Sequence, residues 1–289
     1  MLNQFELLAP LNLNEALTKY AELGNKCKIL AGGTDVLVEM HGGRIYDCLM
    51  DIKNLDELKG VEYSPESGLV IGALTTHRYL ERMPLIKELY PALYDGVSQV
   101  GAVQTRYRGT IGGNICNAAP SGDSLGPLLA LDARFVVQSM QGIREISFED
   151  FFTGAKKTAL NPGELLVKIL LPPPPAKSGS AYTKFTRRNA MDLALLGVAV
   201  NLTSEDGKMC KNVRISLSTS APTVIRAKNA EQFLTGKELT EDVLKEAGVI
   251  ASKDASPRSS WRSSEEYRRE LLKSIVPRTI KKAQERIKE

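Results

Sequence analysis

The first fifty residues of the chain pass from a helical to a strand-like pattern of apolar side chains. Apolar positions in residues 13–21 recur at helical spacing after Asn12 or Asn14, either of which suits a helix cap. Two short apolar strands follow over residues 27–30 and 48–52, separated by a glycine turn and a brief helical stretch. A strand, helix, strand order of this length favours parallel pairing of the two strands.

Beyond residue 60 the pattern changes to short strands mixed with short helices. Strand-like apolar runs cover residues 68–74, 134–140 and 164–172. Helix-like runs cover residues 84–100 and 123–133. This alternation, in which we find no internal repeat, predicts a mixed α+β arrangement.

Four consecutive prolines interrupt the pattern at residues 172–175, and we interpret them as a linker. The residues after them begin with three strand-like runs that predict a small antiparallel sheet, and continue with helices. The predicted fold is therefore α+β, with two α/β subdomains and a C-terminal part built from the sheet and helices. The expected bounds are a first domain of 1–174, with subdomains of about 1–56 and 57–174, and a second domain of 178–289.

Composition and charge exclude several classes of protein. Hydrophobic residues make up 43% of the 289 positions, which is ordinary for a chain with a globular core. The 38 lysines and arginines nearly balance the 34 acidic residues, so the chain lacks a nucleic-acid footprint. No apolar run approaches the roughly 18 to 20 residues that cross a bilayer, and the N-terminal residues do not resemble a secretion signal. We therefore expect a cytoplasmic protein that binds neither nucleic acid nor membrane.

The cysteines and histidines do not form the pattern of a metal or catalytic site. Cys27, Cys48, Cys116 and Cys210 are spread singly, without the paired spacing of a zinc ribbon or a four-thiolate cluster. We expect them to be reduced thiols that pack as small apolar residues. The two histidines have no partner at ligand or triad spacing. The sequence thus predicts no metal ligand and no catalytic residue on this chain.

Two glycine pairs carry the clearest chemical signal. Gly32 and Gly33 precede Thr34 between the first predicted strand and helix, and a second pair lies in "TIGGNIC", residues 110–116. Glycine pairs allow positive φ and close approach of a ligand to backbone N–H groups, which suits a phosphate. Neither pair matches the Rossmann or P-loop sequence, and one pair alone is also typical of a tight turn. Together they predict a clamp around the diphosphate of a dinucleotide.

Two residues near the second pair have alternative interpretations. Asp123 can accept hydrogen bonds from a ribose or adenine, or it can cap the helix predicted from this position. Cys116 can place a thiol beside the cofactor, or it can be a buried spacer. The residues alone leave both choices open.

Several stretches resemble the signatures of one family. "LAGGTDVL" (30–37), "TIGGNICNAAPSGD" (110–123), "GELLVKILLP" (163–172) and "KFTRRNAMDLA" (184–194) look like the FAD-binding subunit of molybdenum hydroxylases, in family order. The stretch "SPRSSWRSSEEYRRELL" (256–272) resembles the bacterial xanthine dehydrogenase branch. The resemblance implies the FAD-binding PCMH-type fold, which is that of the vanillyl-alcohol-oxidase and MurB flavoproteins.

The resemblance also implies which residues contact a non-covalent FAD. In the family the diphosphate lies between the two glycine loops, Asp123 would reach the adenosine portion, and residues 100–104 run near the isoalloxazine. Animal xanthine oxidoreductases carry an aromatic residue where this chain has Val100, and this departure removes the basis for a ring-stacking contact. The implied contacts are Leu30, Ala31, Gly32, Gly33, Thr34, Asp35, Val36, Val100, Gly101, Thr110, Ile111, Gly112, Gly113, Asn114, Cys116, Asp123, Leu165, Leu166 and Lys184.

A flavin subunit of this kind implies partners. A large molybdenum-cofactor (molybdopterin) subunit and a small [2Fe–2S] subunit are expected, in a heterotrimer or a dimer of heterotrimers. The expected reaction oxidises xanthine or hypoxanthine with NAD as acceptor, and a ferredoxin-like protein is the other acceptor considered. Alternatives are the medium subunit of a carbon monoxide, nicotinate or aldehyde dehydrogenase, a self-sufficient MurB-like flavoenzyme, and a non-redox nucleotide-binding module.

Overall fold

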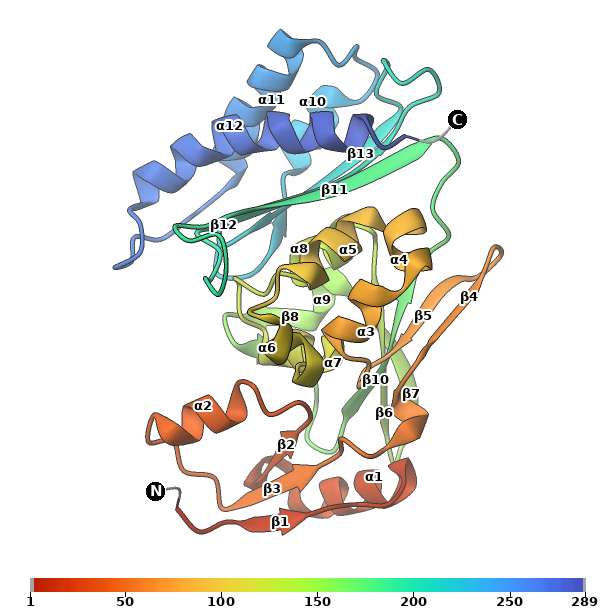
Figure 1. Cartoon of the computed structure of the whole chain (residues 1–289), viewed down its shortest axis with the longest axis vertical. Coiled ribbons are helices and arrows are strands. Elements are labelled where there is room, and N and C mark those ends of the chain that lie inside the picture. The colour runs from red at the N-terminus through yellow and green to blue at the C-terminus, as the bar shows by residue number, and fades with distance from the viewer. Residues whose placement is uncertain (1–2, 288–289) are drawn as a thin grey trace.

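The computed structural model describes residues 3–287 and arranges them in three units along the long axis of the molecule (Figure 1). An N-terminal unit lies at the bottom of the view, a middle unit of sheet and helices lies above it, and a C-terminal unit lies at the top. Within the described residues, no helix has both the length and the apolar character that a membrane span requires.

The N-terminal unit is a small parallel sheet with its connecting helices. Its elements are β1 (Glu6–Leu8), α1 (Leu13–Leu23), η1 (Gly24–Lys26), β2 (Cys27–Leu30), α2 (Val36–His41), β3 (Cys48–Asp51) and η2 (Asp56–Leu58). Helix α1 begins at Asn12, whose side chain accepts a hydrogen bond of 2.9 Å from the N–H of Glu15. The strand order is β1-β3-β2, and β2 pairs with β3 in parallel, which confirms the pairing predicted for these two strands.

The middle unit is a five-stranded antiparallel sheet with helices on one face (Figure 1). Its strands are β4 (Val61–Ser64), β5 (Gly68–Gly72), β6 (Arg134–Ser139), β7 (Gly142–Ser147) and β10 (Leu165–Leu171), in the order β4-β5-β10-β6-β7. Its helices are α3 (His77–Arg82), α4 (Pro84–Leu89), α5 (Pro91–Ser98), α6 (Val103–Arg108), α7 (Ile111–Asn117), α8 (Leu125–Ala130) and α9 (Phe148–Phe151). A short ribbon of β8 (Phe152–Gly154) and β9 (Lys157–Thr158) precedes β10.

Strand β10 joins the cores of the first two units because its side chains point to both faces of the sheet, with a register shift between Leu166 and Lys168 that interrupts their alternation. Leu166 and Ile169 pack into the core beneath the helices of the middle unit. Leu165 and Val167 face the other way and pack with Leu17 of α1. The N-terminal unit is therefore held against the sheet, and both faces of β10 are buried.

The C-terminal unit is an antiparallel sheet covered by long helices. Its elements are β11 (Ser178–Phe185), β12 (Leu196–Thr203), β13 (Asn212–Ser218), β14 (Ile225–Arg226), α10 (Lys228–Leu234), α11 (Glu241–Asp254) and α12 (Glu265–Gln284). Val198 and Val200 pack toward the helices of this unit, whereas Ala199 packs with Ala130 of α8 in the middle unit. The sheet is thus the contact between the two units.

Asp95 of α5 ties the C-terminal unit to the middle unit. Its carboxylate accepts hydrogen bonds from Lys282 at 3.0 Å and from Arg286 at 2.7 Å, and from the N–H of Tyr182 at 3.0 Å. The Asp95 carboxylate is buried, so its charge needs these partners.

Two local expectations differ from the structure. The helix-like run of residues 84–100 is divided into α4 and α5, because Pro91 opens a new helix directly after Tyr90. The second glycine pair, expected in a loop, lies in the first turn of α7.

Candidate functional site

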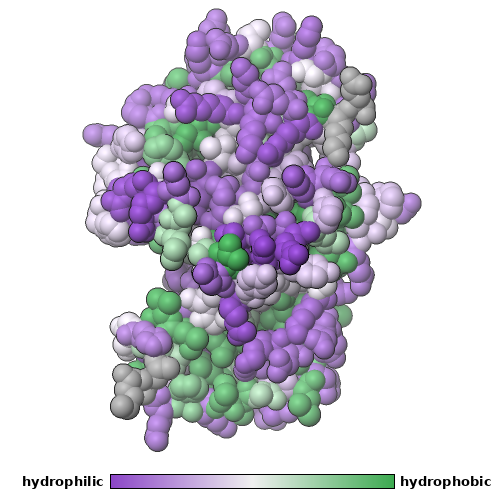
Figure 2. Space-filling model, in the orientation of Figure 1, coloured by the Kyte–Doolittle hydropathy of each residue, from purple (hydrophilic) through white to green (hydrophobic). Residues whose placement is uncertain are grey.

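A cavity of about 690 Å³ lies where the three units meet. The first glycine loop, β2 and α2 line it from the N-terminal unit, and α7 and β10 line it from the middle unit. Met191, Asp192 and Leu193 reach it from the C-terminal unit. Figure 2 shows the surface hollowed on the left, between the N-terminal unit and the parts above it.

The first glycine loop, residues 31–35, needs its two glycines for different reasons. Gly33 has φ +77°, a conformation that side-chain-bearing residues rarely adopt. Gly32 lies so close to the chain before α7 that a Cβ would overlap the backbone of Arg108. The loop can therefore pack directly against the segment that precedes the second glycine pair.

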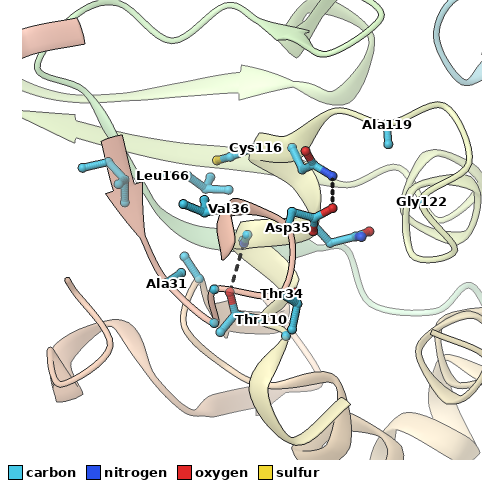
Figure 3. Close-up of a pocket in the computed structure, with 18 of the residues that line it drawn as sticks. Ala31, Thr34, Asp35, Val36, Thr110, Cys116, Ala119, Gly122 and Leu166 are labelled. Carbon is cyan, nitrogen blue, oxygen red and sulfur yellow. Dashed lines mark hydrogen bonds between the residues drawn. The ribbon is translucent and has the colours of Figure 1, made fainter. Parts of the chain in front are cut away.

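The second pair needs glycine for space and not for positive φ, which corrects the expectation from the sequence. Thr110 caps α7, and its hydroxyl accepts a hydrogen bond of 3.1 Å from the N–H of Gly113 (Figure 3). A Cβ on Gly112 would lie 2.6 Å from the carbonyl oxygen of Ala73. A Cβ on Gly113 would meet only the Thr110 hydroxyl and Ala31, so this glycine leaves open the wall of the cavity.

The two glycine segments lie side by side, as the clamp predicted from the sequence requires. The side-chain amide of Asn117 donates a hydrogen bond of 2.9 Å to Asp35 (Figure 3). Thr34 lies beside Gly109, because a Cβ placed there would be 3.6 Å from the Thr34 hydroxyl. Segments almost eighty residues apart in the sequence thus form one wall.

The two segments do not contribute equally to an anion site. In α7 the N–H of Ile111 donates to Thr75, and that of Gly112 donates to Ala73. Across residues 3–287, the N–H groups of the first loop, from Gly32 to Asp35, donate to no backbone acceptor. The first loop therefore offers a run of adjacent N–H donors for a diphosphate, whereas the glycine pair of α7 supplies a face without side chains.

Asp123 and Lys184 contact each other. The Lys184 ammonium lies 2.8 Å from the Asp123 carboxylate and 3.1 Å from the carbonyl oxygen of Gln99. The Tyr182 hydroxyl donates to Asp123 at 3.2 Å. Burial raises the pKa of the Asp123 carboxyl to about 6, although the Lys184 charge and both hydrogen bonds oppose this effect.

The helix-cap interpretation of Asp123 is wrong. Ser124 occupies the capping position of α8, and no side-chain hydrogen bond caps that helix. Asp123 instead lines the cavity. Cys116 is exposed and lines the cavity as well, so the buried-spacer interpretation does not apply to it.

Most of the residues singled out from the sequence line this cavity. Three do not: Leu30 in β2, Ile111, which is fully buried in α7, and Lys184, which stands behind Asp123. The lining members of the predicted set are Ala31, Gly32, Gly33, Thr34, Asp35, Val36, Val100, Gly101, Thr110, Gly112, Gly113, Asn114, Cys116, Asp123, Leu165 and Leu166.

A polar network at the edge of the cavity was not predicted from the sequence. Lys156, from the turn between β8 and β9, donates to Asn117 at 2.8 Å and pairs with Glu39 of α2 at 3.4 Å. The Tyr46 hydroxyl donates to Glu39 at 2.6 Å. Burial, followed by this contact, raises the pKa of Tyr46 to about 12. No motif marks these residues, because they are brought together from three separate segments.

The expectation of four reduced thiols is wrong for two of them. Cys27 and Cys48 form a disulfide between β2 and β3, where the strand register places them directly opposite each other. Their separation of 21 residues matches no motif, so only the pairing of the strands reveals it. Cys116 and Cys210 are free.

The lining residues fit FAD. The free N–H groups of the first loop suit a diphosphate, and the bare face of Gly113 leaves room for it. The apolar side chains of Ile29, Leu165 and Leu166 line the same cavity and suit a flavin ring.

Two family models together match nearly the whole chain. Residues 3–174 match the family described as the FAD binding domain in molybdopterin dehydrogenase. Residues 180–283 match the CO dehydrogenase flavoprotein C-terminal domain.

Individual relatives point the same way. The xanthine dehydrogenase FAD-binding subunit of Escherichia coli O157:H7 is 36% identical over 260 residues, 89% of each chain. The nicotinate dehydrogenase FAD-subunit of Eubacterium barkeri is 30% identical and covers 95% of this chain and 94% of its own. A chain in the structure of carbon monoxide dehydrogenase from Hydrogenophaga pseudoflava superposes with a TM-score of 0.94 at 31% identity, covering 100% of both chains.

The α+β, FAD-binding PCMH-type fold expected from the sequence is thereby confirmed, with its small antiparallel sheet in the C-terminal part. Matches to both family descriptions extend over nearly all of the residues, and the cavity carries the features that a flavin dinucleotide needs. This chain belongs to the family of FAD-binding subunits of molybdenum hydroxylases.

Proposed function

We propose that the chain holds FAD in this cavity and serves as the electron-transfer subunit of a purine-oxidising molybdenum hydroxylase, with NAD as the acceptor. The observation that carries the proposal is the first glycine loop. Its N–H groups, between Gly32 and Asp35, have no backbone acceptor within the described residues, and these residues line the cavity of about 690 Å³.

The chain's own residues would bind and orient the cofactor. The first loop would donate hydrogen bonds to the diphosphate, while Gly113 and Asn114 would border it from α7. Leu165, Leu166 and the backbone at Val100 and Gly101 would border the ring. All nineteen residues named from the sequence remain part of the proposed site. Sixteen of them line the cavity and would contact the cofactor, whereas Leu30, Ile111 and Lys184 would support the lining residues.

Partners would supply the remaining chemistry. FAD, when bound, can exchange single electrons with iron–sulfur centres and pairs of electrons with NAD. Among the described residues there is no group of three or more His, Cys, Asp or Glu side chains placed to hold a metal ion. A molybdopterin subunit and a [2Fe–2S] subunit in a heterotrimer, or a pair of heterotrimers, would complete the enzyme.

The choice of a purine substrate rests on the relatives and the C-terminal sequence. The relative with a xanthine dehydrogenase name is 36% identical, compared with 30% for the nicotinate enzyme subunit and 31% for the carbon monoxide enzyme chain. A subunit of a carbon monoxide or nicotinate dehydrogenase is the second candidate. We also propose the domain bounds of 1–174 and 178–289, since the first family match ends and the second begins near the proline linker. We propose a cytoplasmic location as well.

Flavin content tests the cofactor assignment. The full chain should purify with FAD or bind it when it is added, with a rise in Tm. In Gly113→Val a branched side chain would project from the bare wall of the cavity, so flavin content should fall at least tenfold. Gly154→Val is the matched control, because a Cβ there would meet nothing closer than 3.8 Å and the residue does not line the cavity. Undiminished flavin in Gly113→Val would contradict the proposal.

Purification of the complex from its native host tests the partners and the substrate. The flavin chain should copurify with two further subunits, and xanthine should reduce NAD in their presence only. Turnover of a substrate by the isolated chain would instead indicate a self-sufficient flavoenzyme. Turnover of carbon monoxide or nicotinate, with no turnover of xanthine, would favour the second candidate.

A further inference from the structure

We propose that a surface beside the cavity is a docking site for a small acidic electron carrier of the [2Fe–2S] ferredoxin class. This arginine–tryptophan surface comprises Arg187, Arg188, Arg258, Trp261 and Arg262. The inference rests on the flavin site of the proposed function, and it gives the reduced flavin a protein acceptor in place of NAD.

Trp261 is the centre of this surface. Its side chain is 80% exposed, and it carries the guanidinium groups of Arg187 and Arg262 at 5.0 and 5.6 Å from the ring centroid. Met191 and Leu193, on the same loop as Arg187, are also exposed. Exposed tryptophan and arginine side chains are the residue types that most often contribute to the binding energy of protein interfaces.

The positive charges of the surface are largely uncompensated. Within residues 3–287, no carboxylate lies within salt-bridge distance of Arg187, Arg258 or Arg262, while Arg188 pairs with Asp192 at 3.6 Å. Arg268 lies beneath them, 5% exposed, and donates to the carbonyl oxygens of Leu195 and Thr219 and to the hydroxyl of Ser260.

Two of these guanidinium groups also have buried N–H donors that are not satisfied. The Nε atoms of Arg262 and Arg268 and the Nη1 atom of Arg262 have no hydrogen-bond partner among the described residues. Burial lowers the pKa of Arg268, and the neighbouring charges of Arg262 and Arg258 lower it further. A group of like charges without a counterion favours the approach of an anionic partner.

The surface adjoins the mouth of the cavity. Asp192 accepts hydrogen bonds of 3.2 Å from the N–H groups of both Arg187 and Arg188, which fixes the turn between β11 and β12. Met191 to Leu193, in the same turn, line the cavity. Figure 2 shows strongly hydrophilic side chains gathered on the left of the C-terminal unit, where Figure 1 places this turn and the start of α12.

The form of the surface favours a protein over a free nucleotide. Small ligands bind in concave sites that bury most of their surface, whereas the Trp261 ring protrudes. Electron-transfer encounters between proteins are small, and complementary charge steers them. Two oxidised carrier molecules would each take one electron from a fully reduced flavin, whose protons would pass to solvent.

Binding of a plant-type [2Fe–2S] ferredoxin to the FAD-loaded full chain tests the proposal. We expect calorimetry at low ionic strength to detect binding that weakens as salt is added, because exposed charges are screened. Arg187→Glu/Arg258→Glu should weaken the affinity at least tenfold, and Trp261→Ala should weaken it less. Both arginines are exposed, so their replacement leaves the core intact.

Arg278→Glu/Lys281→Glu is the matched control, since it reverses two exposed charges on the same unit and so changes the net charge as much as the double variant does. Arg278 is exposed and lies thirteen residues beyond the start of α12, about 20 Å along the helix axis. The control variant should bind ferredoxin within twofold of the original chain.

Three results would overturn the proposal: no ferredoxin binding by the unmodified chain, unchanged affinity in the double variant, or equal loss in the control. A double variant that binds ferredoxin normally but shows a raised KM for NADH would assign the surface to the nucleotide instead. Flavin absorbance of the same samples distinguishes failure of the docking proposal from failure of the proposed function, because a chain that binds no flavin overturns the proposed function itself.

Discussion

Lys184 of β11 and Asp123 of the middle unit form an enclosed ion pair across two units, 2.8 Å apart, with their side chains 6% and 8% exposed. The lysine also holds the carbonyl of Gln99, the residue before Val100 in the cavity wall. The C-terminal unit therefore supports the cavity from behind, although it supplies few of the lining residues.

Lys184→Met should lower the free energy of unfolding by about 3 to 5 kcal/mol, because it leaves the buried carboxylate without its counter-charge. Urea denaturation at pH 7 measures the change. Lys184→Met/Asp123→Leu should recover part of the loss, since no uncompensated charge remains. A double variant as unstable as Lys184→Met, or a loss below about 1 kcal/mol as for an exposed pair, would argue against this account.

His77 should make the protein sensitive to acid. The side chain is 1% exposed, and burial, assisted by the charge of Arg106, lowers its pKa to about 4. An unfolded histidine titrates near pH 6.5, so between these values the unfolded chain binds a proton that the folded chain does not. Stability from this group should therefore be lost as the pH falls from about 6.5 to 4, by up to about 3 kcal/mol.

Chemical denaturation of the original chain and of His77→Gln at several pH values between 7 and 4 checks this prediction. The glutamine does not titrate, so the variant should lose less stability over the window. Parallel curves would show that His77 does not control the acid response.

The Cys27–Cys48 pair should determine how many thiols react in the denatured chain. Under non-reducing conditions, alkylation should modify Cys116 and Cys210 alone, and reductant should raise the number of modified cysteines to four. Cys27→Ser should lower the free energy of unfolding by about 3 kcal/mol, the cost expected for opening a loop of this size. Reaction of all four thiols without reductant would indicate that the pair is reduced in the purified protein.

Local pattern was sufficient to predict many elements. The strands expected at 27–30 and 134–140, found as β2 and β6, and the parallel pairing of β2 with β3 follow from apolar runs and their connection. The division of α4 from α5 and the helical state of the second glycine pair did not follow. The two missed features depend on short-range signals, a proline at the first position of α5 and the threonine that caps α7. The spacing of apolar residues alone does not reveal either signal.

The candidate site, too, was only partly predictable from the sequence. Both glycine segments were recognised, because glycine is needed where the backbone approaches another chain segment or adopts positive φ. The network of Glu39, Tyr46, Asn117 and Lys156 was not, because each member is an ordinary surface residue until the fold brings them together.

By itself the sequence determined many of the element types, the glycine positions that a close approach requires, and the family signatures. The tertiary structure decided that the N–H groups from Gly32 to Asp35 stay without backbone acceptors, that Asp123 pairs with Lys184, and that Cys27 faces Cys48. The physical reason is that spacing along the chain controls local conformation, whereas hydrogen bonds and ion pairs between distant segments depend on strand register and on how the three units pack.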